Sequence, residues 1–139
     1  MPTIFKLSEG CNLALHAMMI LASEPEARHD TASLAQRLDA SAHHLAKILQ
    51  QLQRAGFVAA VRGPKGGFKL TKPASEVTLL TLYELIDGPL EVKDCLLDTP
   101  RCQGTSCCGV GRFLGRAGRE FKQLLARTTL ADVCQRWQP

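Results

Sequence analysis

The chain has 139 residues, with 17 Lys and Arg against 13 Asp and Glu, and it contains six cysteines. This length predicts one domain that buries a core without disulfides, and 45% apolar with 22% charged residues excludes wholesale disorder. No run approaches the roughly 20 apolar residues of a membrane span. We therefore expect a cytoplasmic protein, in which clustered cysteines more often bind metal or sense redox state than form structural disulfides.

The first predicted element is an amphipathic helix over residues 11–22. A signal peptide is the alternative, but only Lys6 precedes the apolar run with a positive charge, and polar residues interrupt it. The residues that fall on one face of this helix are Leu13, Ala17, Ile20 and Leu21. We expect Cys11, on the same helix, to be a small packing residue.

Two helices joined by a short turn come next. Asp30 or Thr31 can cap a helix over residues 32–38, and Ser41 can cap a second helix that ends before Gly56. Such a helix-turn-helix places its second helix in the major groove of DNA. The residues predicted to face the DNA from the start of that helix are Ser41, Ala42, His43, His44 and Lys47.

A basic β-hairpin follows, with strands predicted over residues 57–61 and 67–71 and a glycine-rich turn between them. Residues 40–75 contain six basic and no acidic side chains. Charge alone would fit a solvated surface. Because these basic residues lie on a helix-turn-helix and the hairpin after it, they favour a surface that contacts DNA phosphates. The hairpin is therefore predicted to be a wing that contacts DNA through Arg62, Gly63, Pro64 and Lys65, with the arginine in the minor groove.

Four of the cysteines lie within fourteen residues, at positions 95, 102, 107 and 108, directly before a helix predicted over residues 109–127. The N–H groups at the start of that helix favour an anionic centre. Several thiolates in one loop suit an iron–sulfur cluster or zinc, and a metal-free thiol–disulfide sensor is the alternative. Cys11, Cys107 or another exposed thiol would serve such a sensor.

The predicted helix over residues 109–127 carries an apolar face that needs a partner. Gly115 and Gly118 weaken the helix but allow close backbone approach. The residues of this face are Phe113, Leu114, Ala117, Phe121, Leu124 and Leu125.

Several of these segments resemble the Rrf2 family of bacterial winged-helix transcription regulators, which includes IscR, NsrR and RsrR. The resemblance covers residues 6–133. It is carried by Ser33-Leu34-Ala35, by the leucine-rich second helix, by residues 78–88 and most specifically by the wing sequence Val61-Arg62-Gly63-Pro64-Lys65-Gly66-Gly67-Phe68.

The resemblance implies a mainly α fold with a small β-hairpin wing and a long dimerisation helix. The DNA-binding domain would cover residues 1–88, a cysteine-rich sensor loop 89–108, and the dimerisation helix with the terminal segment 109–139. It implies a homodimer that binds near-palindromic double-stranded operator DNA. An enzyme with a small-molecule substrate is disfavoured, because the sequence has no nucleophile motif and no cofactor fingerprint.

The resemblance also implies a ligand set for an iron–sulfur cluster, 2Fe–2S in preference to 4Fe–4S. Cys95, Cys102 and Cys108 take the three cysteine positions, and Cys107 competes for the third. The fourth ligand is expected from the first helix of the other chain, as Asn12 or Glu9 of the partner subunit. For His16, on that helix, a redox-linked role is weighed against a structural one, and Cys134 is predicted to be a packing residue.

Overall fold

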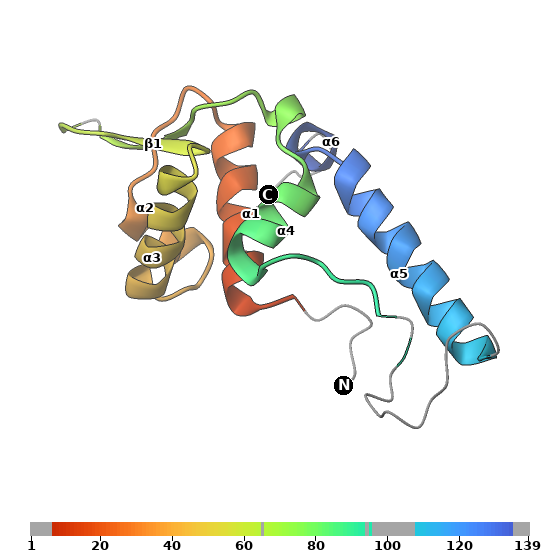
Figure 1. Cartoon of the computed structure of the whole chain (residues 1–139). Helices are drawn as coiled ribbons and strands as arrows, with labels where there is room; N and C mark the ends of the chain where they lie inside the picture. The colour runs from red at the N-terminus through yellow and green to blue at the C-terminus, as the bar shows by residue number, and fades with distance from the viewer. Residues whose placement is uncertain (1–6, 65, 94, 96–107, 135–139) are drawn as a thin grey trace.

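The computed structural model describes residues 7–64, 66–93, 95 and 108–134. The described elements are α1 (Glu9–Ser23), α2 (Thr31–Arg37), α3 (Ala42–Arg54), β1 (Val58–Val61), β2 (Gly67–Leu70), the 3-10 helix η1 (Ala74–Glu76), α4 (Leu79–Asp87), α5 (Gly109–Arg127) and α6 (Leu130–Cys134). The predicted fold class, mainly helical with an antiparallel hairpin, is confirmed. In Figure 1 the hairpin, α2 and α3 lie at one side of the molecule and α5 at the other, with α1 and α4 between them.

Side-chain caps fix where the first helices begin. Asp30 caps α2 and Ser41 caps α3, each by accepting a hydrogen bond from the backbone N–H three residues on, as predicted. The first helix begins two residues earlier than expected because Ser8 caps it in the same way. In the short turn between α2 and α3, Asp39 adopts a positive φ of 48°. At the other end of α3, Gly56 follows the helix with a φ of 79°.

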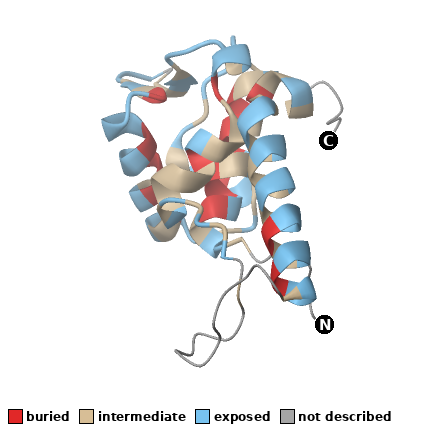
Figure 2. Cartoon of the chain, turned by 45° about the vertical axis from the view of Figure 1, so that its right-hand side comes forward, coloured by how far each residue is buried: buried red, intermediate tan, exposed pale blue. Residues whose placement is uncertain are grey.

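The core lies where α1 packs against α3, α4 and α6, and Figure 2 shows buried residues in the interior of the molecule. The short α6 returns the chain to this core after α5. Leu130 donates its N–H to the carbonyl of Val77 at 2.8 Å, and Leu79 donates to the carbonyl of Thr128 at 2.9 Å. The largest fully buried side chains are Met18, Ile20, Leu21, Leu34, Leu45, Leu49, Leu52, Leu82 and Leu130.

The predicted apolar face of α5 is covered by the rest of the chain on one side only. Phe113, Ala117 and Leu124 are exposed, together with Val110, at helical spacings of three, four and seven residues. The others are half-buried, because α5 lies against α4 and the segment after it on that side: Leu114, Phe121 and Leu125. We call the four exposed residues the outer stripe.

Gly118 makes room for a side chain of the same chain at the inner side of α5. A Cβ added to Gly118 would lie 2.9 Å from Cγ1 of Val92. The segment that leads from α4 toward Cys95 is thereby held against the helix. Among the described residues, no helix is long and apolar enough to cross a membrane.

Candidate DNA interface and cysteine site

The first turn of α3 presents the residues that were predicted to face DNA. Ser41, Ala42, His43 and Lys47 are exposed, and His44 is half-buried. The opposite side of α3 packs into the core through its buried leucines. The amino-terminal end of α3 is thus free to enter a major groove, while its other face holds it on the domain.

A shallow groove runs along α3 beyond those residues. Gln50, Gln51 and Arg54 line it together with His44, Lys47 and Ile48. The first three were not among the predicted DNA-facing residues, although they follow Lys47 at spacings of three, four and seven, which place them near it on a helix. Glutamine amides and an arginine guanidinium are donors that suit base edges and phosphates.

His44 is also linked to the start of α1. Its Nδ1 lies 3.6 Å from Oε1 of Glu9, the first residue of that helix. Ser8 fixes the same turn, because its side chain hydrogen-bonds the carboxylate of Asp87 at the end of α4. Glu9, a predicted fourth-ligand candidate, therefore lies beside the helix that is predicted to read DNA, and its side chain is 77% exposed.

The other polar residues of α1 lie on the same exposed side. Asn12 and His16 follow Glu9 at spacings of three and seven residues, and all three are exposed. Nδ1 of His16 lies 2.8 Å from the backbone carbonyl of Asn12. The imidazole thus has a structural partner within its own helix, and the side chain of Asn12 is open to a partner subunit.

The wing is a two-stranded ladder with a glycine-dependent tip. Val58 pairs with Leu70 and Val61 with Gly67. At the tip, Arg62, Gly63 and Pro64 are exposed, and Lys65 lies outside the described residues.

The tip is closed by a bond from the N–H of Gly66 to the carbonyl of Gly63 at 2.8 Å. A Cβ on Gly66 would lie 2.4 Å from the carbonyl of Val61, so the tight turn needs a glycine there. The same turn leaves the guanidinium of Arg62 at the exposed end of the hairpin.

Two of the predicted cluster cysteines lie among the described residues. Cys108 is the N-cap of α5, and its Sγ accepts a hydrogen bond from the N–H of Gly111 at 3.4 Å. The sulfur of Cys108 therefore lies at the positive end of a helix of 19 residues. Cys95 is half-buried, and Cys102 and Cys107 lie outside the described residues. No group of three or more His, Cys, Asp or Glu side chains that could hold a metal occurs within the described residues.

The two remaining cysteines are packing residues, as predicted. Cys11 is fully buried, and burial together with the charge of Asp87 raises the pKa of its thiol to about 11. Such a thiol stays protonated near neutral pH, which removes Cys11 from the possible redox-sensing thiols. Cys134 is half-buried, its Sγ lies 3.6 Å from the carbonyl of Met19, and burial raises its pKa as well.

Residues 7–136 match the family model Rrf2, which describes iron-dependent transcriptional regulators. The fold is similar to that of CymR, the global cysteine regulator of B. subtilis, with a TM-score of 0.81 and 25% sequence identity over 97% of this chain and 100% of that one. The oxidised form of Staphylococcus aureus CymR is similar with a TM-score of 0.77 and 24% identity, over 97% of this chain and 100% of that one. For T. potens IscR the TM-score is 0.72 with 22% identity, over 95% of this chain and 88% of that one.

Proposed function

Because the chain belongs to the Rrf2 family of transcriptional regulators, we propose that it is a homodimer whose operator binding is controlled by an iron–sulfur cluster. The family consists of regulators and not of enzymes. The ligands would be Cys95, Cys102 and Cys108, and the protein would act on double-stranded DNA in the cytoplasm. One observation carries the proposal: Cys108 caps the same helix that bears the exposed outer stripe.

This arrangement joins the sensing residue to the dimer contact. The outer stripe begins at Val110, two residues after Cys108, and Val110 and Phe113 are 62% and 69% exposed. A second copy of α5 would cover this stripe, as expected for a contact between identical subunits. Because α5 is one continuous helix, a displacement of Cys108 also displaces the stripe.

The donor chemistry of the described cysteines suits such a cofactor. When bound, an iron–sulfur cluster supplies an anionic centre that responds to redox state, nitric oxide and iron–sulfur status. Cys108 places a sulfur ligand at the positive end of α5, where the helix dipole would favour an anionic cluster. Cys102 would complete the set with Cys95, Cys107 competes with Cys108, and a 2Fe–2S cluster is favoured over 4Fe–4S. Glu9 of the partner subunit or Asn12 of the partner subunit would supply the fourth ligand from an exposed turn.

DNA binding would divide between α3 and the wing. We expect His43 and His44 to read base edges in the major groove, and Arg62 to enter the minor groove. In this proposal residues 1–88 bind DNA, residues 89–108 sense, and residues 109–139 dimerise. Arg62→Ala should weaken binding to all sequences, whereas His43→Ala should change the sequence preference. Equal effects of both variants on every sequence would refute this division.

The proposed cofactor is tested on anaerobically purified protein by its absorption spectrum together with iron and acid-labile sulfide. We expect a coloured protein that holds both, and Cys108→Ser should lower its iron and sulfide content. Cys134→Ser is the matched control, because that thiol lies against the core, and it should keep them. Colourless, iron-free protein after anaerobic reconstitution would refute the cluster, and a colourless metal without sulfide would indicate zinc.

A cluster-free thiol–disulfide repressor of the same fold is the second candidate. The similarity to the oxidised form of S. aureus CymR favours it. Since Cys11 is buried and protonated, the reactive thiol would be Cys107 or another accessible cysteine. Peroxide would then produce a crosslinked species on a non-reducing gel, and its absence would argue against this candidate.

A further inference from the structure

The wing is attached on both sides of its second strand. Besides its pairing with β1, β2 forms a bridge to the loop between α1 and α2, where the N–H of Phe68 donates to the carbonyl of His29 at 2.9 Å. The fit is close, because a Cβ on Gly67 would lie 2.7 Å from the same carbonyl. The wing is therefore fixed to the backbone of His29 close to its tip, at the second residue of β2.

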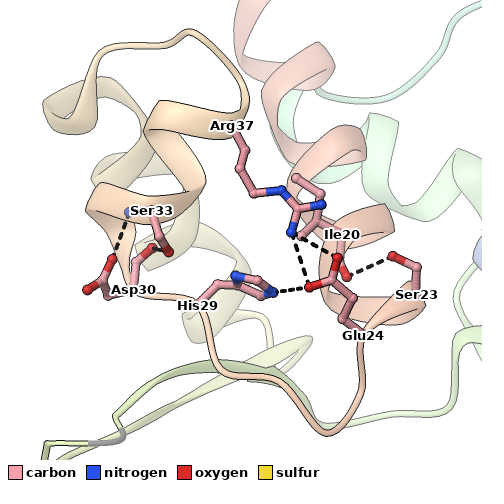
Figure 3. Close-up of polar contacts among 7 residues, drawn as sticks. All are labelled: Ile20, Ser23, Glu24, His29, Asp30, Ser33 and Arg37. Carbon is pink, nitrogen blue, oxygen red and sulfur yellow. Dashed lines mark hydrogen bonds and ion pairs between the residues drawn. The ribbon is translucent and has the colours of Figure 1, made fainter. Parts of the chain in front are cut away.

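The side chain of His29 is held in turn by Glu24, the residue that follows α1. Figure 3 shows the Glu24 carboxylate between His29 and Arg37. Nε2 of His29 lies 2.7 Å from Oε2, and Nη1 of Arg37 lies 2.9 Å from Oε1 and 3.1 Å from Oε2. The side chain of His29 is only 13% exposed. One carboxylate thus joins the end of α1, the loop that carries the wing, and the last turn of α2.

The described residues of the wing tip border an open hollow. An open, mostly polar hollow lies between the loop and the tip, lined by Arg28, Asp30 and Ser33 on one side and by Pro64 and Gly66 on the other. Apolar packing therefore does not set the position of the tip across this hollow. The hydrogen bond from Phe68 to His29 holds β2 beside this hollow, close to the tip.

We propose that Glu24 is a positioning residue for DNA binding: through His29 it sets where the wing presents Arg62, and through Arg37 it ties that position to the helix-turn-helix. This inference rests on the proposed DNA-binding function. A protein that reads the major groove with α3 and the minor groove with its wing needs a fixed relation between the two. Releasing the wing means that binding must order it again, which lowers affinity.

The test uses the full-length protein and a duplex selected by the wild type from a pool with a randomised core. Glu24→Gln should weaken binding to this duplex by roughly tenfold, because binding must then also meet the entropic cost of ordering the released wing. Hydroxyl-radical protection should be lost in the minor groove and kept where α3 binds. In a protein that already carries Arg62→Ala, Glu24→Gln should change affinity by less than about twofold, because the wing contact is gone.

Two matched controls separate positioning from stability and charge. Thr78→Ala removes the side-chain cap of α4, away from Glu24 and from the hollow under the wing, and its effect on affinity should multiply with that of Arg62→Ala. Glu76→Gln makes the same charge change on exposed η1 and should bind like the wild type. If the effects of Glu24→Gln and Arg62→Ala on DNA affinity also multiply in the double variant, the proposal is overturned. It is likewise overturned if Glu24→Gln binds DNA like the wild type.

A measurement without DNA tests separately whether Glu24 holds the wing in place. Amide hydrogen exchange at Phe68 should be faster in Glu24→Gln than in the wild type, and unchanged exchange overturns the proposal even if no duplex is selected. Failure of the wild type to select any duplex would instead refute the proposed function. If Glu24→Gln does not fold, His29→Ala reaches the same bond from the other side, keeps the backbone bridge, and is expected to give the same results.

Discussion

Truncation of Phe113 provides a quantitative test of the outer stripe as a dimer contact. A phenylalanine side chain buries about 150–250 Å². Since Phe113 is 69% exposed within one chain, on the order of 130 Å² is left for a partner to cover. At about 25 cal/mol per Å² this is worth ~3 kcal/mol per copy, of which Phe113→Ala removes about 2 kcal/mol or more.

In a twofold-symmetric dimer the loss occurs in both subunits, so the dissociation constant should rise about a thousandfold or more. Sedimentation equilibrium over a range of protein concentrations measures it. The fold of the single chain should be unchanged, because the ring does not belong to the core. Arg112→Ala, at an exposed neighbour of the stripe, is the matched control and should leave the dimer intact. A Phe113→Ala protein that dimerises like the wild type would refute the stripe as the contact.

Three further predictions concern stability and thiol reactivity. Gly67→Ala should lower the free energy of unfolding by about 2 kcal/mol or more in urea titrations, because φ is +151° and the added Cβ meets the backbone of His29; a stability equal to that of the wild type would contradict this. Arg37 and His29 lower the pKa of the Glu24 carboxyl in the folded state, so its stabilisation is present above the unfolded pKa and is lost as the pH falls toward the lowered one. The difference in unfolding free energy between wild type and Glu24→Gln should therefore shrink from pH 7 toward pH 3, and a constant difference would count against the ion pairs. Alkylation of the native metal-free protein at pH 8 should modify Cys108 much faster than Cys11, and equal rates would show that Cys11 is not buried.

Local patterns in the sequence predicted most of the fold. Helices α2 and α3 follow from the caps Asp30 and Ser41 and the apolar spacing of each helix, because capping and periodicity depend on neighbouring residues. The wing follows from its glycine-rich turn in the same way. The start of α1 was misplaced because the capping role of Ser8 was overlooked, although serine is a common N-cap.

Contacts between distant segments were not predicted. Glu24 and Arg37 are thirteen residues apart, His29 and Phe68 are joined only once the hairpin folds back onto the loop, and no periodicity reports either pairing. The division of the α5 face has the same origin. Leu114 and Phe113 are adjacent in sequence, and the neighbouring segment that α5 packs against decides which of them is covered.

Part of the candidate site could be predicted from the sequence. The candidate DNA-facing residues at the start of α3 followed from the position of that helix, and Gln51 and Arg54 of the groove would have followed from extending the same helical face. The proximity of Glu9 to His44 could not be predicted from the sequence, because it depends on how α1 packs against α3.

The central claim, control of operator binding by a cysteine-held cluster, is tested most directly by DNA affinity measured before and after the cluster is removed from the same protein. We expect the two affinities to differ, at fixed salt, by at least about fivefold, the lower end of typical coupling between two sites. Cys108→Ser should bind DNA with the affinity of the cluster-free wild type, and removal of metal should not change it further. Equal affinities of cluster-loaded and cluster-free wild type, with the cluster verified by iron and sulfide content, would contradict the claim.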